Sequence, residues 1–130
     1  MSISLFFEVE AGANLETVLQ ALDWVQAEYS DGPDGLHGHL PASNAGFRFG
    51  IVEPTQAIVA EGMDVEWRVG LLGSFHFRAS RFECAWGENC RFIKRYAAAC
   101  ELQFVLSLHF ESTFAARLGQ RLIFPGPTAP

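Results

Sequence analysis

Alternating apolar and polar positions mark several strands along the chain. Residues 3–9 form an apolar run of strand-like composition that turns acidic as it ends. The cleanest alternation covers residues 102–110, where every second position is Leu or Phe. Shorter stretches of strand character lie at 47–52, 57–61, 65–69 and 75–80. We predict strands in all of them.

Glycines between apolar segments predict how the later strands connect. Gly73 interrupts the alternation between residues 64 and 82, which predicts a hairpin with its turn at this glycine. Gly119 separates the apolar segments 114–118 and 122–124, which predicts a final hairpin, with a short helix followed by a strand as the alternative. These connections describe a meander of neighbouring strands.

Two segments follow the period of an α-helix. The first begins after Asn14, whose side chain can cap a helix, and its apolar positions recur at three- and four-residue steps. These positions are Leu15, Val18, Leu19, Leu22, Val25 and Tyr29. The second begins at Glu88, and its apolar face consists of Phe92, Ile93, Tyr96, Ala97 and Cys100. Trp24 lies at the edge of the first helical face, where we expect it to flank the core.

These elements predict an α+β fold with a mostly antiparallel sheet of about 6–8 strands and two main helices packed on it. The length of 130 residues suits one domain that buries its own core. We place this domain at residues 1–124 and expect residues 125–130, rich in proline, to form a flexible tail.

Composition points to a globular protein of a reducing compartment. Apolar residues make up 49% of the chain and charged residues 18%. Cys84, Cys90 and Cys100 are odd in number and match no zinc spacing, so a disulfide framework is not expected. The N-terminus lacks the features of a leader sequence, and no apolar run is long enough to span a bilayer. We therefore expect a cytoplasmic protein with no membrane partner.

Charge is distributed unevenly along the sequence. Residues 1–66 contain eleven acids and a single Lys or Arg, Arg48, whereas residues 67–130 contain eight Lys or Arg and four acids. Folding can interleave the two halves, so this asymmetry need not produce two faces. An acidic N-terminal half nevertheless argues against a nucleic-acid partner, because phosphates require a basic surface. It favours a basic protein as the partner.

The segment SDGPDGLHGHLPASN, residues 30–44, is rich in glycine, aspartate and histidine, and we expect it to be a loop. Its acids do not have the spacing of a calcium loop, and Pro41 occupies the last ligand position. His37 and His39 could share a metal only with a third ligand that no spacing indicates. The glycines match no phosphate-binding motif. We expect no metal or cofactor here, and an acidic binding loop or a plain connector remains.

Catalytic chemistry has little support in the sequence. A cysteine could pair with His76 or His109 and an acid such as Glu111, but no local signature indicates such a site. Buried structural thiols explain the cysteines better. His109 and Glu111 also share one predicted strand face with Ser107 and Gln103, which is typical of a solvated face or of the floor of a small-ligand pocket. We therefore expect that the protein is not an enzyme.

Five segments together resemble the small, acidic, single-domain immunity proteins encoded beside bacterial polymorphic toxins, including toxins delivered by type VI and Rhs-type systems. They are ISLFFEVE (3–10), NLETVLQALDWVQAEY (14–29), LHGHLPASNAGFRF (36–49), AEGMDVEWRVGLLGSFHF (60–77) and ELQFVLSLHFES (101–112). The resemblance covers most of the chain in general character and transfers no residue role. It implies an inhibitor that binds a cognate toxin domain in the producing cell and occludes its active site or substrate entry.

Charge then suggests where the toxin would bind. Carboxylates placed against a basic cleft steer association and give selectivity. The expected contact surface consists of Glu28, Asp31, Asp34, His37, His39, Glu53, Glu61 and Asp64, with Trp24 as an aromatic anchor if it is exposed. A competing hypothesis places an acidic toxin on Arg91, Lys94 and Arg95. The alternative function is a small-ligand binder or a homo-oligomeric adaptor, and a homodimer is compatible with either function.

Overall fold

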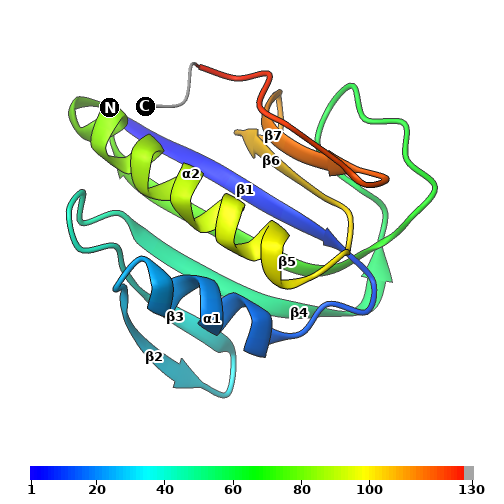
Figure 1. Cartoon of the computed structure of the whole chain (residues 1–130), viewed down its shortest axis with the longest axis horizontal. Coiled ribbons are helices and arrows are strands. Elements are labelled where there is room, and N and C mark those ends of the chain that lie inside the picture. Colours follow the sequence, from blue (N-terminus) through cyan, green and yellow to red (C-terminus); the bar gives the residue numbers. More distant parts are fainter. Residues whose placement is uncertain (128–130) are drawn as a thin grey trace.

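The computed structural model describes residues 1–127 and contains two α-helices and one eight-stranded sheet (Figure 1). The elements in chain order are β1 (Ser2–Glu10), α1 (Leu15–Trp24), β2 (Glu28–Gly32), β3 (Gly35–His39), β4 (Gly46–Gln56), β5 (Val69–Arg78), a 3-10 turn (Ala79–Arg81), α2 (Phe82–Ala99), β6 (Phe104–Leu108), β7 (Ser112–Leu118) and β8 (Arg121–Ile123). The predicted α+β class is confirmed.

The sheet has the strand order β2-β3-β4-β5-β1-β6-β7-β8, and every neighbouring pair is antiparallel. β1 lies in the interior, between β5 and β6. This arrangement leaves β2 and β8 as the edge strands. No helix within residues 1–127 is both long and apolar enough to cross a membrane.

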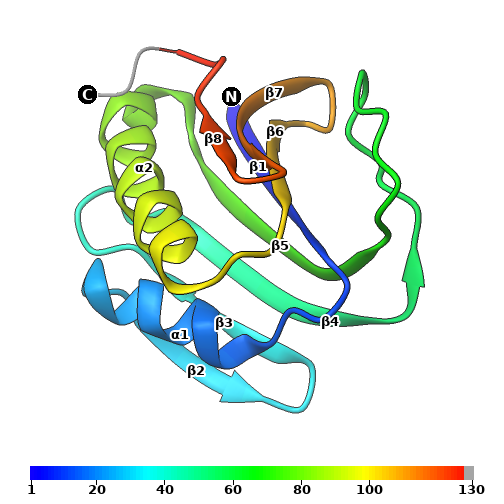
Figure 2. The same ribbon diagram turned by 45° about the vertical axis from the view of Figure 1, so that its right-hand side comes forward.

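The main core lies between the sheet and the two helices, which pack side by side on one face (Figures 1 and 2). Strand side chains alternate between the faces, so Leu5, Phe7 and Val9 of β1 all point to the helices and are fully buried. The Phe7 ring lies 5.2 Å from Tyr96 of α2 and 5.2 Å from Phe104 of β6, measured between centroids. Each such side chain stabilises the fold by about 1.5–3 kcal/mol through burial.

The opposite face of the sheet is covered only in part. The segment 57–68 crosses it and contributes Ala60 to a small second core with Val105 and Ala116. The carboxylate of Glu8, fully buried on this face, accepts hydrogen bonds from the backbone N–H groups of Val59 (2.7 Å) and Ala60 (3.0 Å). Desolvation raises the pKa of this carboxyl, and the two N–H donors offset the rise in part.

Helix α1 ends earlier than its apolar period predicts. The N–H of Gln26 donates to the Asp23 carbonyl and the N–H of Ala27 to the Leu22 carbonyl, which is a Schellman motif. Gln26 has a φ of 61°, a conformation more often taken by glycine at this position. The prediction that Tyr29 extends the helical face is therefore wrong, because Tyr29 lies in β2.

Three predictions, one of a loop, one of a strand and one of a turn, are also wrong. Residues 30–44, expected to be a loop, contain parts of the β2–β3 hairpin, whose strands are polar or glycine-rich and largely exposed. Residues 57–61 are not a strand. Gly73 does not turn the chain: β5 runs through it, and a Cβ at this position would collide with the ring of Phe49. The hairpin at Gly119 is confirmed as β7 and β8.

Two predicted element boundaries in the C-terminal half differ in the structure. Helix α2 begins at Phe82 rather than Glu88, and its first turn has no side-chain cap that could have indicated the start. β6 ends at Leu108, because His109 and Phe110 have φ values of 51° and 63° and form a turn. Of the expected tail, Gly126 donates to the Phe114 carbonyl (3.3 Å), while residues 128–130 lie outside the described part of the chain.

Candidate functional site

Six of the nine residues in the predicted contact surface lie around the β2–β3 edge of the sheet. They are Trp24 at the end of α1, Glu28 and Asp31 on β2, Asp34 in the hairpin turn, and His37 and His39 on β3. The other three lie elsewhere: Glu53 near the C-terminal end of β4, and Glu61 and Asp64 in the segment 57–68. The structure thus splits the predicted surface in two.

The alternation of β2 and β3 further divides the residues at this edge. Asp31 is paired with the buried Leu36, so both point to the helix side of the sheet. Tyr29 shares this side, and its hydroxyl donates to the Asp23 carboxylate of α1 at 3.0 Å. This hydrogen bond raises the pKa of Tyr29. Glu28, paired with His39, points to the opposite side.

We name Asp23, Trp24, Glu28, Tyr29, Asp31 and Asp34 the acidic edge. All six are exposed, and residues 15–39 contain no Lys or Arg. Within residues 1–127, β2 has only one neighbouring strand, so this edge of the sheet has no further strand beside it. The acidic edge therefore presents carboxylates, two aromatic side chains and a free strand edge together.

Trp24 is 60% exposed, so the expectation that it flanks the core is wrong. The guanidinium of Arg95 lies 4.7 Å from the centroid of its ring, a cation–π contact that holds the indole on the surface. A hollow of about 610 Å³ opens beside it, lined also by Pro41, Ala42 and Arg91. The basic face of α2 and the acidic edge thus adjoin at Trp24.

The β3–β4 connection is anchored to α2 by a buried carboxylate. Glu88 is 2% exposed and accepts hydrogen bonds from the N–H groups of Ala42 (2.8 Å) and Ser43 (3.0 Å). Arg81 donates to the Ala42 carbonyl at 2.7 Å. These contacts fix the connection that leads from the acidic edge into β4. Sequence reasoning missed Glu88, because a glutamate inside a helix is usually a surface residue.

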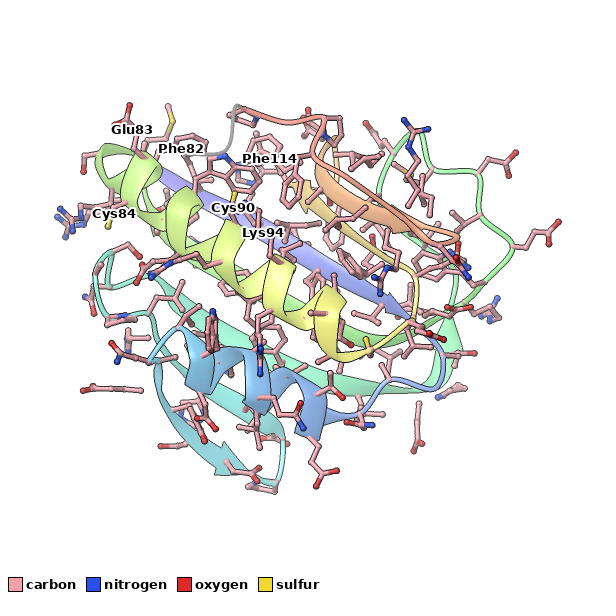
Figure 3. The ribbon with its side chains drawn as sticks, in the orientation of Figure 1. Phe82, Glu83, Cys84, Cys90, Lys94 and Phe114 are labelled. Carbon is pink, nitrogen blue, oxygen red and sulfur yellow. The ribbon has the colours of Figure 1, made fainter. Side chains whose placement is uncertain are left out.

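The structure places the cysteine Cys90 and the histidine His76 apart. Figure 3 shows Glu83 and Cys84 at the N-terminal end of α2 and Cys90 further along the helix. Cys90 is buried in the core, and burial raises the pKa of its thiol to about 11, so it is protonated at neutral pH. His76 points from β5 to the face of the sheet opposite the helices. A pair of Cys90 with His76 is therefore not assembled, because the two side chains lie on opposite faces of the sheet.

The predicted polar stripe through Ser107, His109 and Glu111 does not form. Ser107 is fully buried, whereas His109 and Glu111 are exposed in and beside the turn after β6. Across residues 1–127, no group of three or more His, Cys, Asp or Glu side chains is placed to hold a metal ion.

No protein family, curated protein or solved structure matches this chain.

Proposed function

We propose that the protein is an immunity protein that binds a cognate toxin domain through the acidic edge and blocks its active site or substrate entry. The observation that supports this proposal is the acidic edge itself, in which four exposed carboxylates and the exposed rings of Trp24 and Tyr29 lie within residues 23–34. The resemblance to the immunity proteins of polymorphic toxins suggests the same class of partner.

The chemistry of the acidic edge suits a basic partner surface. Toxins that act on nucleic acid or nucleotides need basic clefts to hold phosphate groups, and carboxylates facing such a cleft accelerate association. Trp24 and Tyr29 add large, partly apolar contact areas of the kind that dominates binding energy in protein interfaces. The carboxylates would raise the rate of association and give selectivity, and the aromatic side chains would slow dissociation.

The position of the acidic edge also suits inhibition. A free strand edge lined by Glu28 and Asp31 opposes pairing with a second copy, because like charges would meet. The β2–β3 hairpin forms the margin of the sheet (Figure 1) and turns at Pro33 and Asp34. A hairpin at the margin can enter a cleft while the rest of the sheet stays outside it.

The test begins with co-purification of the tagged protein from its source cells, which identifies a toxin domain as the bound partner. Cells that express this toxin are then protected with the wild-type protein or with Glu28→Lys/Asp31→Lys. We expect the wild type to restore growth and the variant to lose at least tenfold in protection, because two carboxylates of the contact become repulsive.

Glu61→Lys/Asp64→Lys is the matched control, since it changes the net charge equally on the segment 57–68. It should protect as well as the wild type. Equal protection by the Glu28→Lys/Asp31→Lys variant, or the absence of any toxin domain among the bound proteins, would contradict the proposal. Circular dichroism of both variants verifies that each is folded.

A further inference from the structure

A second site lies on the other face of the sheet, away from the helices. The side chains that point to this face form rows across the strands. One row runs from His37 on β3 through Arg48 on β4 and Ser74 on β5 to Phe6 on β1. The next row contains His39, Gly46, His76 and Ser4. Three of the four histidines of the chain thus surround Arg48.

Small residues leave open space around Arg48. Gly46 and Gly50 lie two positions before and after it on β4 and share its face, so no side chain flanks it along the strand. Two hollows of about 330 Å³ and 440 Å³ adjoin there, and both are lined by Phe6, His37, Arg48 and Ser74. We name the two together the Arg48 hollow.

The walls of the Arg48 hollow are held in place. The ring of Phe6 stacks on that of Phe110, with centroids 4.0 Å apart and planes at 9°. The Ser4 hydroxyl and Nδ1 of His76 are 2.8 Å apart and share a hydrogen bond. Leu72 adds apolar surface. The hollow therefore combines a fixed apolar wall with polar groups that keep their positions.

Arg48 is free to bind a ligand. Arg68 and Arg81 each donate to a backbone carbonyl, whereas no hydrogen bond is found for the Arg48 guanidinium within residues 1–127, and the side chain is exposed. Few negative charges lie near Arg48. Asp34 lines one hollow, and Glu28 lies opposite His39 in the β2–β3 register, at the margin of the sheet. Glu8, on the same face, is occupied by the N–H groups of Val59 and Ala60.

We propose that the Arg48 hollow binds a small organic anion that joins a carboxylate or phosphate group to a flat apolar body. The guanidinium of Arg48 binds the anionic group through paired hydrogen bonds, as this side chain does with planar oxyanions. His37 on β3 and His76 on β5 line the hollow on either side of Arg48. Phe6 and Leu72 contact the apolar body. The site shares Asp34 with the acidic edge but does not depend on the proposed toxin.

Titration of the whole protein with benzoate and with phenyl phosphate, followed by amide chemical shifts, tests this proposal. We expect shifts at the residues that line the Arg48 hollow and weak or no binding of benzyl alcohol, which has the ring but no charge. Phenyl phosphate binding more tightly than benzoate assigns the ligand to the phosphates, and the reverse order to the carboxylates.

Arg48→Gln should weaken binding at least tenfold, because it removes the one permanent cation of the hollow. Arg121→Gln, an equal charge loss on β8 at the opposite edge of the sheet, should leave affinity within about twofold.

Three results would overturn the proposal. They are shifts that fall outside the Arg48 hollow, equal loss of affinity in the two arginine variants, and benzyl alcohol binding as tightly as benzoate. If circular dichroism shows that Arg48→Gln is unfolded, two results still test the proposal. They are the location of the shifts in the wild type and the comparison of benzoate with benzyl alcohol.

Discussion

Two buried glutamates play the same part at opposite sides of the sheet. Glu8 and Glu88 each accept hydrogen bonds from two consecutive backbone N–H groups and so tie a long connection to a buried element. A carboxylate suits this geometry because its two oxygens accept both bonds at once. Sequence patterning did not predict either role, since a charged residue inside a strand or helix is ordinarily exposed.

Replacing Glu88 with Gln should lower the free energy of unfolding by about 1.5–3 kcal/mol, because the amide offers one acceptor where two N–H groups need partners. Urea denaturation measures the change. Glu83→Gln, at an exposed position on the first turn of the same helix, should change the stability by less than about 0.5 kcal/mol. Equal effects of the two substitutions would show that Glu88 does not anchor the connection.

Glu8 should make the stability depend on pH. Its folded pKa is raised above the ordinary value of 4.5, so its contribution is fully present below that pH and is lost as the pH rises through the raised value. The free energy of unfolding of the wild type should therefore fall relative to that of Glu8→Gln as the pH rises from 4.5. Urea denaturation across this range measures the difference, and a difference independent of pH would contradict the assignment.

At the scale of elements, the sequence predicted β1, the apolar faces of both helices and the last hairpin, because each carries a clear period. The β2–β3 hairpin was missed because its strands are largely exposed and so lack an alternating pattern. β5 was divided in two because glycine usually signals a turn. Its Gly73 instead makes room for the Phe49 ring.

The role of Gly73 predicts a stability change. Gly73→Ala should destabilise the fold by about 1–3 kcal/mol, because the added methyl group overpacks the core against Phe49. Thermal unfolding measures the effect. Gly32→Ala is the control: a Cβ there meets no atom closer than 3.9 Å, and the change should stay within about 1 kcal/mol. A change of less than about 1 kcal/mol in Gly73→Ala would contradict the role of this glycine in making room for the Phe49 ring.

At the scale of the whole molecule, the acidic half of the sequence does not become one acidic face. Its acids divide between the acidic edge, the buried Glu8, the segment 57–68 and single positions on β1, α1 and β4. Six of the nine residues of the predicted contact surface lie around the β2–β3 edge, but proximity to a strand end in the sequence could not place Glu53, Glu61 and Asp64. The sequence did not indicate Arg48 as a binding residue for the same reason. The residues around it come from β1, β3 and β5, which are distant along the chain.

The central claim is that the acidic edge binds the toxin. The most direct measurement is the dissociation constant of the purified toxin domain for the wild type, for Glu28→Lys/Asp31→Lys and for Glu61→Lys/Asp64→Lys, by calorimetry at one salt concentration. We expect the first variant to bind the toxin domain at least tenfold more weakly and the second to bind it like the wild type. Unchanged affinity in the first variant, or an equal loss in both, would contradict it.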